Sequence, residues 1–184
     1  MPRRPLRLLA LGTLPVSATV MTVLLALHLV LVTLGNITDF GTNLAFVRHV
    51  LAMDTTFHDP DLMWRSVTSP VAQSGAYVAV IAWEALTSAV LVWATVLWAA
   101  AHRGGSFGRA RGAATLGYLM ALVLWVGGFL AIGGEWFAMW QSKQWNGLAP
   151  ALRNTVLTSI GLVLTQLPSP QWGTDRPAPL AEGP

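Results

Sequence analysis

Residues 75–100, "GAYVAVIAWEALTSAVLVWATVLWAA", indicate most clearly which fold this chain adopts. A helix needs about 20 mostly apolar residues to cross the hydrocarbon core of a bilayer, and this stretch supplies them with a single ionisable side chain, Glu84. Further runs of this kind lie at about 13–34, 113–132 and 151–167. The sequence therefore predicts an all-α protein, a four-helix transmembrane bundle whose first partner is the lipid bilayer.

The composition excludes several other classes of protein. Of 184 residues, 54% are hydrophobic and 10% are charged, whereas soluble domains carry about 25% charged residues. The formal net charge of +3 is too small and too scattered for a nucleic-acid groove, so we expect no nucleic-acid partner. Cysteine is absent, which excludes disulfides and thiolate metal sites.

The apolar runs define a single transmembrane domain over residues 1–167. The N-terminus has features of a cleaved signal peptide, but its apolar run continues well past the candidate cleavage point, so we expect an uncleaved first span. Residues 168–184 contain five prolines and little to bury. They predict a disordered, proline-rich cytoplasmic tail.

The distribution of basic residues predicts the orientation. Short cytoplasmic loops carry an excess of lysine and arginine. Here three arginines precede the first span, and three more lie in the short connection 101–112. The basic residues of the other side are spread over longer loops that also hold most of the acidic residues. Both termini are therefore expected in the cytoplasm.

The connection from residue 36 to residue 73 is too long to be an idle linker. Within it, Leu44, Val47 and Leu51 have helical spacing, which predicts a short interfacial helix with Thr42 or Asn43 as its N-cap. The two pairs Asp59–Pro60 and Ser69–Pro70 are typical helix starts. They indicate a second short helix in this outer loop and an outward extension of the second span.

The segment "IGGEWFAMWQSKQWNG", residues 132–147, leaves the third span on the same outer side. Tryptophan is enriched at membrane interfaces, because its ring is apolar while its N–H group seeks water. An aromatic belt explains most of this density, and a binding surface is the alternative. The candidate residues of such a surface are Trp64, Arg65, Glu135, Trp136, Trp140 and Trp145.

Two ionisable residues lie inside the spans. Measured from Tyr77, Glu84 is about 10 Å deep, and measured from Leu34, His28 is about 9 Å deep, at ~1.5 Å per residue. An acid at mid-membrane costs at least ~2.5 kcal/mol on insertion scales, so it faces protein or water and often marks function. Glu84 either holds the bundle together through Thr87, Ser88 or His28, or it serves a ligand, a proton or a substrate.

Small residues form a line on the second span, with the spacing that lets another helix pack closely. Glu84 lies on the roughly opposite face of this helix. The line consists of Gly75, Ala79, Ala82, Ala85 and Ala89.

Catalytic and cofactor motifs are missing from the sequence. A buried bis-histidine haem needs a second histidine within a span, and only His28 lies in one. Asp54, Asp59 and Asp61 of the first outer loop lack the spacing and the glycine turn of a calcium loop. We therefore expect no catalytic residue, no metal site and no cofactor.

Several words of the sequence resemble a family of bacterial small integral membrane proteins of unknown function. These words are "TNLAFVRHVLAMDTTF", "LMWRSVTSP", "YVAVIAWEALTSAVL" and "IGGEWFAMWQSKQWNG". The resemblance covers roughly residues 31–164, and its words include Asp54 and all of the candidate residues above except His28. It implies a four-span protein of the cell inner (plasma) membrane and no established activity.

The leading functional hypothesis is a non-enzymatic accessory or binding protein. Its tryptophan-rich outer cap would meet a membrane protein partner or a lipid-like ligand such as a quinone, with Glu84 and His28 below. The alternative is a small proton-coupled transporter in which Glu84 titrates.

Overall fold

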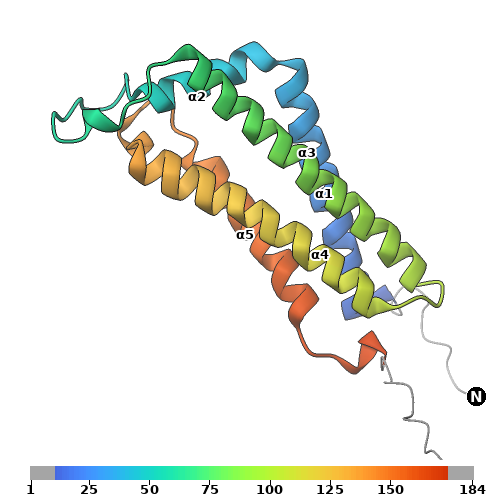
Figure 1. The fold of residues 1–184 in the computed structure, drawn as a ribbon. Coiled ribbons are helices and arrows are strands. Elements are labelled where there is room, and N and C mark those ends of the chain that lie inside the picture. The colour runs from blue at the N-terminus through green and yellow to red at the C-terminus, as the bar shows by residue number, and fades with distance from the viewer. Residues whose placement is uncertain (1–10, 174–184) are drawn as a thin grey trace, which may run out of the picture.

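The computed structural model describes residues 11–173 (Figure 1). Within them the chain is helical and has no strand. In order, the elements are α1 (Leu14–Thr38), α2 (Phe40–Ala52), the 3₁₀ turn η2 (Met63–Arg65), α3 (Pro70–Ala101), α4 (Phe107–Leu122), the π-helix η3 (Val123–Trp136), the 3₁₀ turn η4 (Met139–Gln141), α5 (Leu148–Gln166) and the 3₁₀ turn η5 (Pro170–Trp172).

Four helices are long and apolar enough to cross a membrane, which confirms the predicted all-α bundle. They are α1 with 25 residues, α3 with 32, α4 continued by η3 with 30, and α5 with 19. The start of α3 lies outward of the apolar run, as the Ser69–Pro70 pair predicts. The Ser69 side chain accepts a hydrogen bond from the Ala72 amide there.

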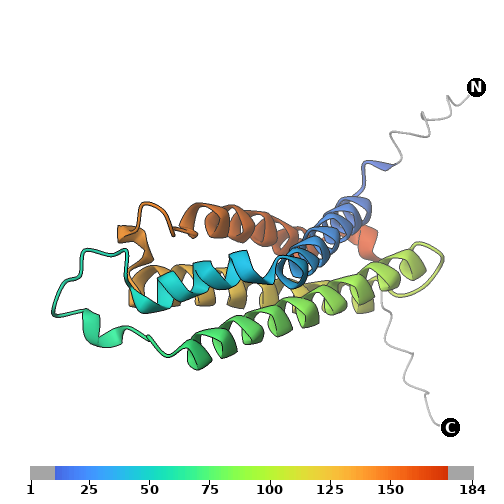
Figure 2. The same ribbon diagram turned by 90° about the horizontal axis from the view of Figure 1, so that it is seen from above.

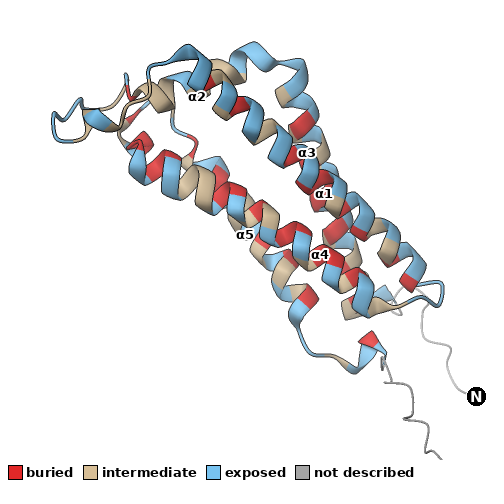
Figure 3. Ribbon diagram, in the orientation of Figure 1, coloured by how far each residue is buried: buried red, intermediate tan, exposed pale blue. Residues whose placement is uncertain are grey.

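The surface of the bundle is apolar and its interior is rich in small residues. Figure 3 shows how buried and exposed residues are distributed along the helices. Large side chains such as Leu24, Val96 and Val163 are more than half exposed. The core is built from alanines of α1, α3 and α4 around Trp98 and Tyr118. This pattern suits a bilayer. Lipid is as apolar as a protein core, so large apolar side chains can face outward, and small residues let the helices approach each other closely.

A ladder of polar contacts sets α1 and α3 antiparallel. Thr19 Oγ1 lies 2.9 Å from His102 Nε2, Trp98 Nε1 donates to Thr22 Oγ1 at 3.1 Å, Thr33 and Ser88 hydroxyls are 3.2 Å apart, and Asn36 Nδ2 donates to Glu84 Oε2 at 2.7 Å. Each of these contacts gives polar side chains a partner that the hydrocarbon of the bilayer could not supply. The ladder therefore places Glu84 at the level of Asn36, well away from His28.

The prediction that the line of small residues on α3 (Gly75, Ala79, Ala82, Ala85 and Ala89) packs against another helix is wrong. All five of its small residues are exposed, and α3 instead buries the face that carries Tyr77, Glu84 and Leu91. The reason is the cost of polar groups in lipid. If the line of small residues faced inward, Glu84, Thr87 and Ser88 would face hydrocarbon. The free-energy cost of exposing them exceeds the stabilisation from close backbone packing.

The short helix of the first long loop is present as α2, although its predicted cap is wrong. The helix begins at Phe40 and its N-cap is Asp39, with no side-chain capping bond, so Thr42 and Asn43 lie inside it. The second predicted helix is reduced to a turn. The Leu62 amide bonds the Asp59 carbonyl, and only Met63–Arg65 follow as a 3₁₀ turn.

The prediction of a disordered tail does not hold for residues 168–173. Trp172 is buried, its ring packs 5.8 Å from the ring of Trp98, and Arg111 lies over it at 4.7 Å. The side chain of Gln171 accepts a hydrogen bond from the backbone amide of Leu14 at 2.8 Å. The rest of the predicted tail, residues 174–184, lies outside the described residues.

Candidate functional site: an apolar cavity beneath a cap

Two connecting regions meet at one end of the bundle and form a cap, residues 40–69 and 137–147 (Figures 1 and 2). Three hydrogen bonds hold them in place. Thr55 Oγ1 donates to Ser142 Oγ at 2.8 Å, the Phe57 amide donates to Gln141 Oε1 at 2.9 Å, and within the first region the Val67 amide donates to the Leu51 carbonyl at 2.7 Å. The cap is therefore a folded unit rather than a pair of loose loops.

His49 fastens α2 to the rest of the cap. Its Nδ1 atom lies 2.8 Å from Asp54 Oδ2, and its ring stacks on Trp145 with centroids 4.4 Å apart. Phe46, one turn earlier on α2, also contacts Trp145, at 6.3 Å between centroids. The Trp145 ring is thus half-buried between two side chains of α2.

Arg65 lies between two tryptophans. Its guanidinium carbon is 4.8 Å from the ring centroid of Trp136 and 5.6 Å from that of Trp64, and its Nη1 donates to the Trp136 carbonyl at 3.4 Å. Cation–π contacts of this kind contribute about 0.5–1 kcal/mol at exposed sites. Trp64, Trp136 and Trp140 remain largely exposed, so the cap presents aromatic rings at its surface.

A partly open cavity of about 210 Å³ lies beneath the cap. Its walls come from α2, α3 and η3 and from the segment that follows η3, which contributes Phe137 and Met139. α2 contributes Phe46 and Val50, α3 contributes Val80, and η3 contributes Leu124, Gly128 and Phe129. All of its lining side chains are apolar or glycine, so the cavity offers contact to hydrocarbon and almost no hydrogen bonds.

The π-helical backbone of η3 places several apolar residues on the same face, toward the cavity. Leu124, Gly128, Gly133 and Phe137 all line the cavity, at successive spacings of four, five and four residues. An α-helix, at about 3.6 residues per turn, would turn Glu135 to this face instead. The wider i→i+5 turn therefore keeps the cavity wall apolar and leaves Glu135 exposed. π-helical segments are rare and occur frequently at functional sites.

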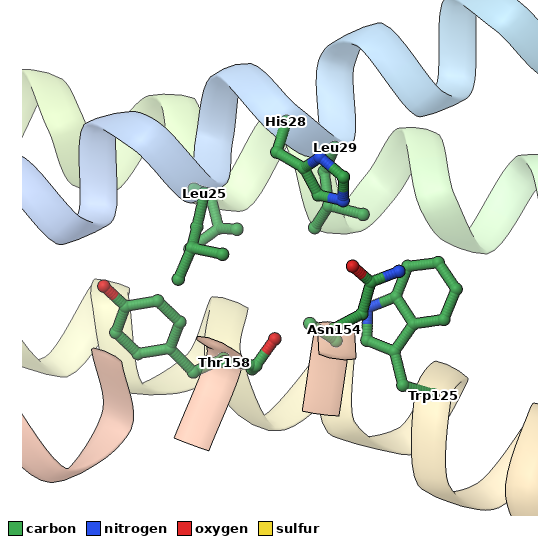
Figure 4. Close-up of a pocket in the computed structure, with 9 residues that line it drawn as sticks. Leu25, His28, Leu29, Trp125, Asn154 and Thr158 are labelled. Atoms are coloured by element: carbon green, nitrogen blue, oxygen red, sulfur yellow. The ribbon is translucent and has the colours of Figure 1, made fainter. Parts of the chain in front are cut away.

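The two ionisable residues of the spans lie apart from this cavity and from each other. Glu84 is 1% exposed and accepts its hydrogen bond from Asn36, while Thr87 bonds the Trp83 carbonyl and Ser88 contacts Thr33. The predicted partners Thr87, Ser88 and His28 are therefore wrong. His28 lines a separate, smaller cavity between α1, α4, η3 and α5 (Figure 4).

The structure brings only some of the predicted site residues together. Trp64, Arg65 and Trp136 form one cluster, Trp140 contacts Phe57, and Trp145 contacts His49. Glu135 is exposed and forms no ion pair with another described residue. Sequence reasoning missed the cavity walls, and the only signal for them was the glycine pairs in residues 127–134.

The described residues contain no group of three histidine or carboxylate side chains that could hold a metal ion. The apolar lining of the cavity can exclude water from an apolar chain.

Comparison with known protein families finds a match. A family described as "Predicted small integral membrane protein (DUF2165)" matches residues 14–168. No curated protein and no solved structure matches the chain.

Proposed function

The chain belongs to the DUF2165 family of predicted small integral membrane proteins, and we propose that it is a non-enzymatic binding protein that holds the apolar chain of a lipid-like molecule under its cap. The observation that carries this proposal is the 210 Å³ apolar cavity between α2, α3 and η3. Apolar cavities with a polar or aromatic rim are the usual sites for small ligands.

The volume limits what the cavity holds. A cavity of about 150 Å³ binds one benzene ring, whereas sites for drug-sized ligands begin at about 300 Å³. A cavity of 210 Å³ therefore suits a segment of an acyl or isoprenoid chain, with the headgroup outside. The aromatic and cationic side chains of the cap, above all Arg65 and its two tryptophans, suit a headgroup at the membrane interface.

The transporter alternative receives less support from the placement of Glu84. The carboxyl is buried, is bonded to Asn36 and lines neither of the two cavities described above. A carrier residue needs a route for its proton or cargo, and Glu84 instead serves the contact between α1 and α3. Arg65 and the exposed tryptophans also suit a partner protein, but no described feature selects one.

A cavity-filling substitution tests the proposal. The β-carbon position of Gly128 has only one neighbour, Leu124 Cδ1 at 3.9 Å, so Gly128→Leu places its side chain in the cavity without a backbone clash. Gly127→Leu is the matched control, because its β-carbon position is open and Gly127 does not line the cavity. Purified variants would be reconstituted with a phospholipid that carries a photoreactive group in its acyl chain.

We expect the wild-type protein and the Gly127→Leu variant to be labelled mainly on α2 and η3, and Gly128→Leu to lose that labelling at least several-fold. Native mass spectrometry of the wild-type protein would then give the mass of the retained molecule, which separates a phospholipid from a quinone. Labelling spread evenly over all lipid-facing helices, and unchanged in Gly128→Leu, would show ordinary boundary lipid and overturn the proposal.

A further inference from the structure

His28 lines a small pocket in the middle of the bundle, where a few polar side chains lie among leucines and an alanine (Figure 4). The pocket has a volume of about 10 Å³ and lies between α1, α4, η3 and α5. His28 lies on α1, Trp125 on η3, and Asn154 and Thr158 on α5. In Figure 4 the imidazole and the Asn154 amide approach each other across it, with Trp125 beside Asn154.

Among the polar side chains that line this pocket, Tyr118 is bonded to Thr22, and the others have no hydrogen-bond partner among the described residues. The Nε2 atom of His28 is fully buried without a hydrogen bond. Among the described residues, the side chains of Trp125, Asn154 and Thr158 form none either. A buried polar group left unpaired costs about 1–3 kcal/mol, and inside a membrane no bulk water relieves that cost.

Neighbouring polar side chains in the bundle are satisfied, so this cluster stands apart from them. Thr22 Oγ1 donates to the Ala18 carbonyl at 2.8 Å, lies 2.8 Å from the Tyr118 hydroxyl and accepts from Trp98 Nε1 at 3.1 Å. Thr155 bonds the Ala151 carbonyl at 2.9 Å. His28 Nε2 therefore differs from these groups in being fully buried without a partner, and Trp125, Asn154 and Thr158 line the same pocket.

The size and chemistry of the pocket identify the ligand. One water molecule needs about 10–15 Å³ and two to four polar partners, and no larger molecule fits. Trp125 Nε1 donates, Asn154 and Thr158 both donate and accept, and His28 Nε2 accepts in one tautomer. We propose that this pocket binds a single ordered water molecule, which links His28 on α1 to Asn154 and Thr158 on α5.

The test is a solid-state NMR measurement on the whole protein in bilayers of deuterated lipid. Histidine would be labelled with ¹⁵N, and the transfer of magnetisation from water protons to the ring nitrogens would be recorded, with a His28→Gln variant to assign the signal. We expect short-range transfer to His28 at a rate well above that of apolar residues at the same depth. A His28 ring as dry as those residues would overturn the proposal without any further variant.

Two substitutions locate the water. Asn154→Leu and Thr158→Val each remove one partner, and either is expected to reduce the transfer to His28 several-fold. Ser159→Ala is the control on the same helix, because Ser159 does not line this pocket, and it should leave the transfer unchanged. Undiminished transfer in both pocket variants, with the Ser159→Ala variant equal to them, would place the water elsewhere and contradict the assignment.

Discussion

Glu84 holds α1 and α3 together at the point where α1 gives way to α2. The Asn36 side chain donates to Glu84, and the Asn36 carbonyl accepts from the Tyr77 hydroxyl at 3.0 Å. Both contacts fall on one residue of α1, three positions before the α1–α2 junction at Asp39. The buried acid therefore ties α1 to α3 about one turn before the start of α2, the helix that supplies one wall of the apolar cavity.

Substitutions at Glu84 should separate a structural carboxyl from a titrating one. Glu84→Ala leaves the Asn36 amide unpaired and is expected to lower the free energy of unfolding by about 1–3 kcal/mol. Glu84→Gln keeps a carbonyl acceptor, so its loss is expected to stay under about 1 kcal/mol, in line with single hydrogen bonds between membrane helices. The measurement is the thermal midpoint of purified protein in lipid nanodiscs.

Glu135→Ala is the control for this series, because Glu135 is exposed and its removal should leave the midpoint unchanged. A Glu84→Gln variant as unstable as Glu84→Ala would contradict the hydrogen-bond account and would show that the carboxyl itself is required.

The partner of Glu84 could not be read from the sequence, because depth was measured from the ends of the apolar runs. Both helices extend beyond those ends, α1 to Thr38 and α3 to Pro70. The polar ladder shows that Glu84 lies at the level of Asn36, about 12 Å along α1 from His28 at ~1.5 Å per residue. The existence of a buried polar layer was predictable, while its register depended on two helix ends that hydropathy does not mark.

At the scale of the elements, α4 and α5 approach closely at Gly161. A β-carbon added at Gly161 would lie 2.8 and 2.9 Å from ring carbons of Tyr118. The Tyr118 hydroxyl is itself bonded to Thr22 on α1. Gly161 therefore lets α5 pack against a tyrosine that already ties α4 to α1.

Gly161→Ala should push α5 away from the bundle. Overpacking of this kind costs about 1–3 kcal/mol, so a lower thermal midpoint is expected. Gly112→Ala on α4 is the matched control, since its β-carbon position is open and alanine favours a helix by up to about 1 kcal/mol. Equal midpoints for the two alanine variants would mean that the α4–α5 contact is loose, contrary to the packing described.

The elements show which patterns carry structural information and which do not. Apolar length predicted all four membrane helices, and helical spacing predicted α2. The π-helical turns of η3 leave no pattern that an α-helical period would reveal. The buried contact of Trp172 was not predicted, because the composition of a proline-rich segment describes the segment as a whole. The burial of one ring depends on tertiary packing, which composition does not show.

At the scale of the whole molecule, the two ends of the bundle differ in construction. The end at residues 102–106 is a short turn closed by Trp172 and its aromatic neighbours. The other end carries the cap, the apolar cavity and exposed tryptophans. The proposed binding function would lie at the capped end, so the side of the membrane that this end faces would decide where a ligand is met.

The basic residues predict that the cap faces away from the cytoplasm. Arg103, Arg109 and Arg111 are concentrated around the short connection between α3 and α4, whereas the cap side spreads its basic residues over longer segments. Concentrated arginine and lysine in short loops set the orientation of a membrane protein. Because the chain has no cysteine, single cysteines can report the orientation in an otherwise native sequence.

The variants for this test are Gly108→Cys and Gln144→Cys, which lie at opposite ends of the bundle at exposed positions. In intact cells stripped of any outer barrier, a membrane-impermeant maleimide is expected to label Gln144→Cys and not Gly108→Cys, and permeabilised cells should show both labelled. The reverse pattern would place the cap in the cytoplasm. The apolar cavity would then open toward the cytoplasmic leaflet, and any lipid-like ligand would have to reach it from that side.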